Sequence, residues 1–330
     1  MEKRILFTTT IDVEVDKSWD WSIPSCVTFK SVVQGIPDIL VPLFERYNAK
    51  PTFLVSPEVL ENDRCIKVLK NIKNCELGTH LHGDLVEPKK TIESLAFSRT
   101  KEMQCSYPPD IEFHKIENLT KLFIIKLGFS PKSFRAGRFG ARGHTIYCLE
   151  KLGYVVDSSV TPGVIHNYPE GNANFVNAPI QPYFPSKEDI TKPGESSVLE
   201  VPVTIIPSKL RIFLLKTLAR TRIATDKIVN IPSSFFHEHW LRPSFESLKN
   251  MIKICNRLIK DKTRDITVLN MMFHSVEVIP NANPYTRSDK DVQDFLIKIE
   301  GVLKYASENG CVFTTLQEAY HHYEEKRDLK

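Results

Sequence analysis

Residues 4–14 read RILFTTTIDVE, an apolar and β-branched run that ends in two carboxylates, Asp12 and Glu14. Such a run predicts a β-strand. Successive side chains of a strand point to opposite faces, so Asp12 and Glu14, two positions apart, project together. A lone D-x-E pattern is usually solvated surface. Its position at the end of a predicted strand makes it a candidate for function.

A second stretch, residues 76–82, reads ELGTHLH and ends in two imidazoles, His80 and His82. These two side chains also share a face if the stretch is a strand. Two imidazoles and one carboxylate, with a fourth position left for water, make a typical catalytic zinc set. The second carboxylate would then be free to act as a base. The two stretches together therefore predict a catalytic metal site.

Strand-like runs alternate with helical patterns along the whole chain, which favours a parallel sheet with crossover helices. About eight strands point to a (β/α) barrel more than to an open sheet. We therefore predict one domain over residues 1–330, a distorted (β/α) barrel of about seven or eight strands, with a long irregular loop at 161–194. The expected strands are 4–11, 51–56, 76–82, 133–136, 155–159, 198–205, 266–273 and 311–315, and the expected helices are 32–47, 57–72, 111–127, 144–152, 205–218, 245–260, 289–308 and 316–326.

Catalytic side chains of such barrels lie at the carboxyl ends of the strands. Seven chemistry-bearing residues fall at predicted strand ends, which argues for one shared site. Arg135 would keep a neighbouring carboxylate ionised, because a close cation lowers its pKa. His274 ends an apolar strand and is either catalytic or a buried core histidine. The seven residues are Asp12, Glu14, His80, His82, Arg135, Asp157 and His274.

Composition excludes some classes of function. The chain has 330 residues, 42% hydrophobic and 25% charged, with 44 Lys and Arg against 40 Asp and Glu. The formal net charge of +4 gives no electrostatic reason to expect nucleic acid as a partner. No apolar run approaches the ~20 residues of a membrane helix, so no transmembrane segment is predicted.

The seven cysteines are scattered and form no C-x-x-C pair, which argues against a disulfide framework and a cysteine zinc site. The first residues, MEKRILFTTTIDVEVD, do not read as a signal peptide. We therefore expect a cytoplasmic location. The sequence leaves the oligomeric state open.

Four segments, taken in chain order, resemble the polysaccharide deacetylase superfamily, carbohydrate esterase family four. T-x-D-x-E at residues 10–14 resembles its first motif, and the histidine stretch at 76–82 resembles its metal-binding motif. F-R-A-G-R-F-G at 134–140 resembles its arginine motif, and F-H-S at 273–275 resembles its last motif. Each segment alone is weak, but four in order make a strong resemblance.

The chain departs from the usual family pattern at three points. Val13 separates Asp12 and Glu14, where the family commonly has adjacent aspartates. The histidines are two positions apart instead of four, and Gly137-Arg138 stands where a proline is more usual. These variants resemble a side branch associated with bacterial surface-polysaccharide loci, so the substrates of chitin and peptidoglycan enzymes are not carried over.

The resemblance implies a metal-dependent hydrolase that removes N-acyl groups, in the first place N-acetyl, from a sugar of a surface polysaccharide or its precursor, such as a nucleotide sugar. The implied cofactor is a divalent metal on Glu14, His80 and His82, zinc first, with Co²⁺, Ni²⁺ or Mn²⁺ as alternatives. Asp12 is the implied base, oriented by Arg135. The order of the first motif gives Asp12 and Glu14 these roles, and the reverse assignment stays open.

His274 is the implied general acid, with Glu277 or Asp157 holding its imidazole. The predicted substrate-binding residues are Arg138, Asp157, Trp21, His239, Trp240 and Tyr285. His237 and His239 could alternatively form a second metal site. Two other functions remain open: hydrolysis of a non-carbohydrate amide, and glycan binding without turnover.

Overall fold

A curled parallel sheet forms the centre of the molecule. The computed structural model describes residues 3–88, 103–168, 171–208 and 239–328. Seven strands pair in the order β11-β1-β2-β3-β4-β5-β8, and β12 pairs with the start of β1, all in parallel. Their bounds are β1 Arg4–Val13, β2 Pro51–Val55, β3 Glu76–Leu81, β4 Ser133–Ala136, β5 Val156–Asp157, β8 Leu199–Glu200, β11 Ile266–His274 and β12 Val312–Phe313.

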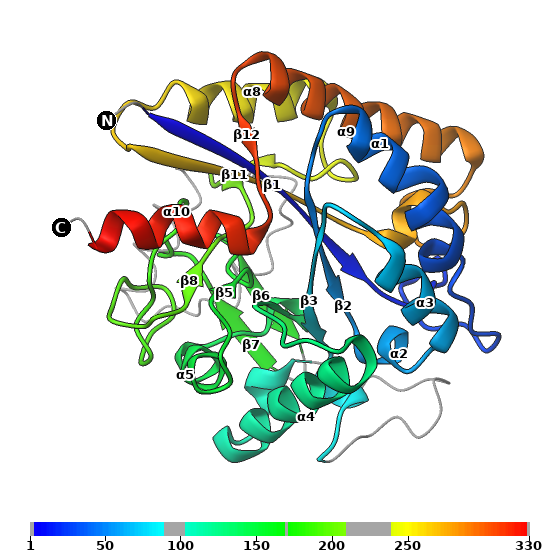
Figure 1. Cartoon of the computed structure of the whole chain (residues 1–330), viewed down its shortest axis with the longest axis horizontal. Coiled ribbons are helices and arrows are strands. Elements are labelled where there is room, and N and C mark those ends of the chain that lie inside the picture. Colours follow the sequence, from blue (N-terminus) through cyan, green and yellow to red (C-terminus); the bar gives the residue numbers. More distant parts are fainter. Residues whose placement is uncertain (1–2, 89–102, 169–170, 209–238, 329–330) are drawn as a thin grey trace, which may run out of the picture.

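Helices flank this sheet (Figure 1). The α- and π-helices of the described residues are η1 Ser31–Leu40 (a π-helix), α1 Val41–Arg46, α2 Pro57–Leu60, α3 Asp63–Asn71, α4 Pro109–Leu127, α5 Gly143–Lys151, α8 Leu248–Ile259, α9 Asp289–Glu308 and α10 Leu316–Asp328. Short 3₁₀ turns are η2 Gly83–Leu85, η3 Gln104–Ser106, η4 Gly137–Phe139 and η6 Ser275–Val278. In the described part of the chain, no helix combines the length and the apolarity needed to cross a membrane.

The sheet closes on itself only indirectly. Within the described residues, the edge strands β8 and β11 do not pair with each other. The chain that follows β8 bridges them instead, because the backbone N–H of Thr204 donates to the carbonyl of Asn270 at 3.1 Å. The predicted distorted (β/α) barrel is therefore confirmed, and its distortion lies at this seam.

Sequence and burial agree in the central strand. From Leu6 to Val13, every residue of β1 is buried, as expected for a parallel strand covered on both faces. Helix boundaries follow local chemistry: Ser288 caps α9 by accepting from the backbone of Asp291, and Gly128, with a left-handed φ of 92°, ends α4. Such signals explain why these two helices match their predicted ranges closely.

Three predicted elements were wrong in detail. The single helix at 57–72 is two helices, because the Asn62 side chain accepts from the backbone of Arg64 and Cys65 and starts a new one. The irregular loop at 161–194 contains an antiparallel hairpin, β6 Ile165–Tyr168 with β7 Gly171–Asn174. The strand at 198–205 is divided between β8 and β9 Ile205–Ile206, which pairs with β10 His239–Trp240. The predicted helix at 205–218 lies mostly outside the described residues.

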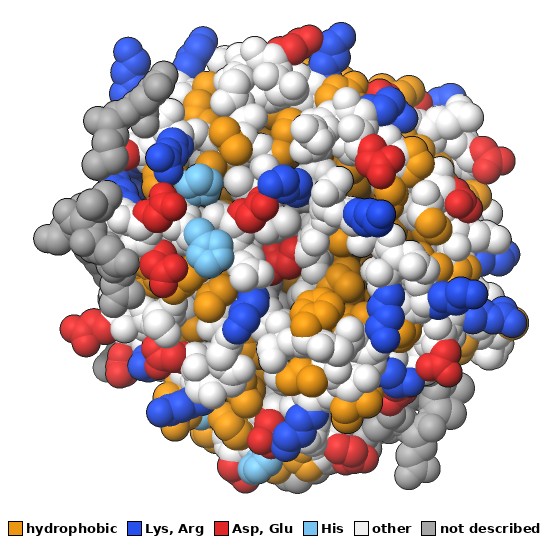
Figure 2. Space-filling view, in the orientation of Figure 1, with side chains coloured by type: hydrophobic (Ala, Val, Ile, Leu, Met, Phe, Trp, Pro, Cys, Tyr) orange, Lys and Arg blue, Asp and Glu red, His pale blue; other side chains and the backbone are white. Residues whose placement is uncertain are grey.

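The surface carries both signs of charge. On the face in Figure 2, basic and acidic side chains are interspersed, with apolar side chains between them. In the described part of that face, neither sign gathers into one extended patch.

Candidate metal centre and active site

The carboxyl ends of neighbouring strands bring the predicted site residues together. Asp12 and Glu14 come from the end of β1, where the order β11-β1-β2-β3 places that strand close to both histidine-bearing strands. His80 and His82 come from the end of β3, and His274 is the last residue of β11. All five line one cleft of about 540 Å³.

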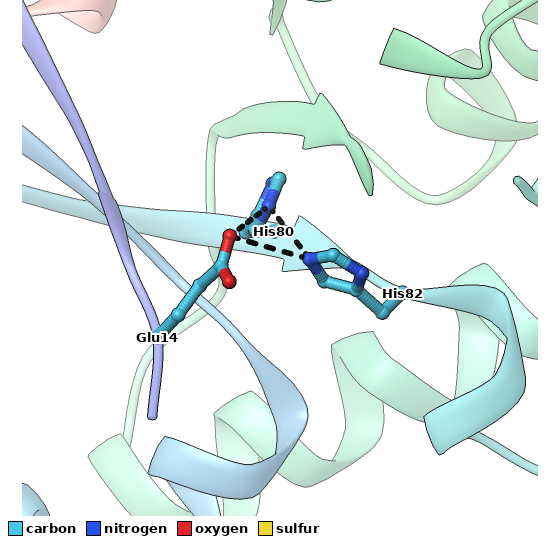
Figure 3. Close-up of side chains that lie close together, drawn as sticks. All are labelled: Glu14, His80 and His82. Atoms are coloured by element: carbon cyan, nitrogen blue, oxygen red, sulfur yellow. Dashed lines mark hydrogen bonds and ion pairs between the residues drawn. The ribbon is translucent and has the colours of Figure 1, made fainter. Parts of the chain in front are cut away.

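Three donor atoms converge at the floor of this cleft (Figure 3). Glu14 Oε1 lies 3.2 Å from His80 Nε2 and 3.3 Å from His82 Nε2, and the two nitrogens are 3.1 Å apart. A tetrahedral ion with bonds of about 2.0 Å separates its ligand atoms by about 3.3 Å. The three donors already have this spacing, and all three residues are buried.

The chemistry of the donor set also fits a divalent cation. The Nδ1 of His80 lies 3.1 Å from the carbonyl of Arg135, so Nδ1–H can donate and leave the lone pair of Nε2 facing Glu14. Two imidazole nitrogens and a carboxylate oxygen, packed together away from water, repel one another unless a proton or a cation lies between them. Imidazole and carboxylate ligands suit zinc and related transition metals.

A different cation holds each carboxylate. Arg135 Nη1 donates to Asp12 Oδ1 at 2.7 Å, and Lys17 Nζ lies 3.0 Å from Glu14 Oε2. Burial alone raises the pKa of Asp12, but Arg135, with His80 and His274, outweighs burial and lowers it. Burial likewise raises the pKa of Glu14, and Lys17 and His82 bring it well below its usual range. Both groups are therefore carboxylates at neutral pH.

His274 faces the same centre from β11. Its Nε2 lies 3.8 Å from both Asp12 Oδ2 and Glu14 Oε1. Its Nδ1 lies 3.0 Å from Oε1 of Glu277, a fully buried residue. Glu277, and not Asp157, is therefore the carboxylate that orients this imidazole. Asp12, Glu14 and His274 also form a second group that could hold an ion, so the geometry alone allows His274 as a ligand.

Aromatic side chains form one wall of the cleft. Trp21 lies 5.0 Å from the His274 ring and 5.5 Å from Tyr285, measured between ring centroids. Tyr285 lies 5.6 Å from Phe245, which lies 5.6 Å from Trp240. Phe245 and Tyr285 are exposed by 45% and 37%. Aromatic faces left open to the cleft can stack on an apolar ligand face.

Backbone strain gathers at the same cleft. Among the described residues, six residues other than glycine have positive φ, and three of them are asparagines, which tolerate it. The other three are Trp21 (φ 67°), Arg138 (φ 53°) and Phe139 (φ 55°), and all three line the cleft. Unfavourable backbone conformations of bulky residues concentrate at functional sites. The strain therefore supports the assignment of this cleft independently of the metal donors.

The structure brings most of the predicted substrate-binding residues into this cleft and leaves two outside. Trp21, Arg138, Trp240 and Tyr285 line it. His239 does not, and its Nδ1 lies 3.0 Å from Glu246 Oε1. The proposed partner of His239 in a second metal site, His237, lies outside the described residues.

Asp157 also lies away from the lining of the cleft. Its side chain is fully buried, and Ser159 Oγ donates to its Oδ1 at 2.5 Å. Its expected contact with substrate is therefore corrected to an interior role. The strand-end rule gave its place along β5 but not the direction of its side chain.

Sequence reasoning missed several residues of the site. Lys17 is buried beside Glu14, three positions later, and this spacing is the one signal that could have revealed it. Arg242 is buried at the cleft with its Nη2 3.2 Å from Glu277 Oε1. The other lining residues outside the prediction include Asp84, Phe139, His166, Tyr168 and Phe245.

Comparison with protein-family models gives no match, and comparison with curated protein sequences gives none. Solved structures share the fold. A candidate glycoside hydrolase/deacetylase from Parabacteroides distasonis is 13% identical with a TM-score of 0.61, over 98% of this chain and 72% of that one. A candidate polysaccharide deacetylase from Pseudomonas aeruginosa PAO1 is 12% identical (TM-score 0.53; 98% and 92%). The Puue allantoinase is 10% identical (TM-score 0.52; 98% and 91%). At these identities the likeness establishes the fold.

Proposed function

We propose that the protein is a metal-dependent amide hydrolase that removes N-acyl groups, in the first place N-acetyl, from a sugar of a surface polysaccharide or its precursor. One observation carries this proposal. A carboxylate–bis-histidine donor set lies in the same cleft as an arginine-held carboxylate and a carboxylate-held imidazole. Amide hydrolysis needs these three components: electrostatic activation, a base for water and an acid for the leaving nitrogen.

Glu14, His80 and His82 would hold the divalent ion, zinc first, with Co²⁺, Ni²⁺ or Mn²⁺ as alternatives. When bound, such an ion polarises a carbonyl group and lowers the pKa of a water molecule. The 3.0 Å contact from Lys17 to Glu14 Oε2 leaves Oε1 as the oxygen that faces the two imidazoles.

Asp12 is the proposed base. Arg135 occupies its Oδ1, so Oδ2 is the atom that would take a proton from water. Arg135 also keeps the pKa of Asp12 low enough for the carboxylate to be present at neutral pH, although burial opposes this. The oxygen of that water would then bond to the acyl carbon.

His274 is the proposed acid. Glu277 holds Nδ1, which leaves Nε2 toward Asp12 and Glu14 at the centre of the cleft. Nε2 would give a proton to the leaving nitrogen as the C–N bond breaks, which yields a carboxylic acid and an amine. The proton taken by Asp12 balances the one given by His274 over the cycle.

The aromatic wall supports a sugar as the substrate, because pyranose rings present apolar C–H faces that stack on exposed aromatic rings. The fold shared with candidate polysaccharide deacetylases is in line with this choice. The departures of the first and second motifs motivate a surface polysaccharide or its precursor, including a nucleotide sugar. All seven cysteines are free thiols, which suits the reducing cytoplasm that we propose as the location of the protein. We also propose that residues 1–330 form a single catalytic domain.

A second candidate is hydrolysis of a small non-carbohydrate amide. An allantoinase shares the fold at a similar TM-score, and the acid, base and metal donors would serve either substrate. The long, partly exposed aromatic wall favours the sugar, because a small polar amide offers little apolar surface to it.

The deciding experiment measures release of the acid. Purified protein is stripped with a chelator and reloaded with Zn²⁺, Co²⁺, Ni²⁺ or Mn²⁺. It is then assayed for acetate from N-acetylated nucleotide sugars and N-acetylated oligosaccharides, and for the ring-opened carboxylate from allantoin. We expect metal-dependent release of acetate from at least one sugar and no ring opening of allantoin. Activity that survives complete metal removal, or activity on allantoin alone, would contradict the proposal.

A further inference from the structure

Arg242 is a buried cation at the cleft that the proposed reaction does not use. It is only 4% exposed, yet it lines the cleft. Its Nη2 lies 3.2 Å from Glu277 Oε1 and 3.2 Å from His274 Nδ1. Arg242 therefore contacts the imidazole on the side opposite to the atom that faces the metal donors.

Its guanidinium is fixed in orientation by two rings. The central carbon lies 4.1 Å from the centroid of the Phe245 ring and 5.6 Å from that of Tyr285. Cation–π contacts of this kind hold the planar group against the rings. Since both rings are partly exposed, a ligand that stacks on them also lies beside the guanidinium.

One donor of this buried group has no acceptor. Arg242 Nε is buried, and it makes no hydrogen bond to any residue in the part of the chain that the structure describes. A buried donor left without an acceptor is unfavourable by about 1–3 kcal/mol, so such groups call for an explanation. Nε itself is covered by neighbouring atoms. Nη1 of the same guanidinium makes no hydrogen bond to a described residue either, and it is the donor that a ligand oxygen in the cleft would meet.

The charge around Arg242 indicates which kind of ligand oxygen would accept this hydrogen bond. Glu277, fully buried, already neutralises the guanidinium at 3.2 Å, and the other close neighbours are aromatic rings. The charge that protonated His274 adds beside this pair faces the carboxylates of Asp12 and Glu14, each 3.8 Å from Nε2. No uncompensated positive charge is therefore left for an anion. A neutral hydroxyl oxygen therefore fits better than a carboxylate or a phosphate.

We propose that Arg242 is a specificity-determining residue that donates a hydrogen bond to a neutral hydroxyl of the sugar that carries the acylamino group. This inference rests on the proposed function, since it takes His274 as the acid beside the leaving nitrogen. Because Arg242 and that nitrogen would flank the same imidazole, the hydroxyl belongs to the same sugar ring. The faces of Phe245 and Tyr285 contact the C–H face of this ring.

The test compares sugars that differ by one hydroxyl. Binding of methyl N-acetyl-β-glucosaminide, its galacto epimer and their monodeoxy analogues is followed by tryptophan fluorescence of the protein as purified, since Trp21 and Trp240 line the cleft. We expect the wild-type protein to bind one parent sugar about 10- to 100-fold more tightly than one of its deoxy analogues, the range for a hydrogen bond to a charged group.

Arg242→Lys keeps the positive charge beside Glu277 and removes the planar guanidinium with Nη1. We expect it to lose this discrimination, to raise KM more than it lowers kcat, and to keep its bound metal. Arg142→Lys is the matched control, because Arg142 pairs with buried Glu112 outside the cleft. It should bind all the sugars as the wild-type protein does.

Three results would overturn the inference: discrimination retained in Arg242→Lys, tighter wild-type binding of the acidic probe N-acetylmuramic acid than of neutral sugars, or no binding of any of these sugars. Failure of the proposed function is a separate result. It would leave hydroxyl discrimination by Arg242 intact while no acyl group is released from any sugar.

Discussion

Asp157→Asn should make the protein more stable at neutral pH and leave it unchanged in acid. Glu200 and Asp157 are register partners on β8 and β5, and both are fully buried. Val160 N–H donates to Glu200 Oε1 at 3.0 Å, and Ser159 donates to one oxygen of Asp157. The other oxygen of each carboxyl, Oε2 and Oδ2, has no hydrogen-bond donor among the described residues. One shared proton explains this arrangement, since two adjacent buried carboxylates repel each other.

The magnitude follows from the pKa of Asp157. Burial raises this pKa from an ordinary 3.8 to about 6, and burial together with the charge of Asp157 raises the pKa of Glu200 well above its usual value. Folded Asp157 therefore keeps its proton up to about pH 6, whereas the unfolded chain loses it near 3.8. The stability that this proton supplies is complete below the unfolded pKa and is lost as pH rises through about 6. The difference between 3.8 and about 6 corresponds to about 3 kcal/mol.

Asparagine at this position stays neutral at every pH and so removes the titration of Asp157. The free energy of unfolding of Asp157→Asn should equal that of the wild-type protein near pH 4 and exceed it by about 3 kcal/mol near pH 8. Urea unfolding followed by circular dichroism, at pH steps between 4 and 8, measures this difference. Glu308→Gln, at an exposed carboxylate on α9, is the control and should change stability by less than about 0.5 kcal/mol at every pH. An Asp157→Asn effect of the same size at pH 4 and pH 8 would refute the raised pKa of Asp157.

Three further predictions concern the metal and the two proton-transfer groups. Purified protein should hold about one divalent ion per chain, and His80→Ala or His82→Ala should abolish it in metal analysis; full occupancy in the double variant would place the ion elsewhere. Asp12→Asn should keep the metal and lose kcat, whereas Glu14→Gln should weaken metal binding in a chelator competition; the opposite pattern would exchange their roles. His274→Ala should lower kcat by roughly 10²–10⁴ and flatten the alkaline limb of the pH–rate profile, with the metal content unchanged; loss of metal would make this imidazole a ligand.

The sequence predicted the fold well because the strands of a buried parallel sheet are almost continuously apolar. The predicted strand at 4–11 and helix at 289–308 match β1 and α9 closely. Short elements were harder to predict. The break at Asn62 needs only one side-chain cap inside a helical pattern, and β6 and β7 carry no strong alternation of apolar and polar residues.

The part of the site that could be predicted is the part in which one strand alone decides which of its side chains share a face. Spacing placed Asp12 with Glu14 on one face, but it could not reveal contacts that depend on how distant segments meet. Arg242 reaches Glu277 across 35 positions of sequence, after a stretch without a recognisable motif. Asp157 was assigned to the site from its position at a strand end, yet its side chain is buried away from the cleft. A strand end shows which edge of the sheet a residue lies at, but not the direction of its side chain.

The two-residue spacing of the histidines is consistent with a working metal site. On a helix, side chains must be three or four positions apart to meet. His80 and His82 instead continue β3, where positions two apart share a face, and their Nε2 atoms lie 3.1 Å from each other. Glu14 extends β1 in the same way and reaches both nitrogens with one oxygen. Two imidazoles two positions apart at the end of a strand, with one carboxylate from a nearby strand end, can therefore hold one ion.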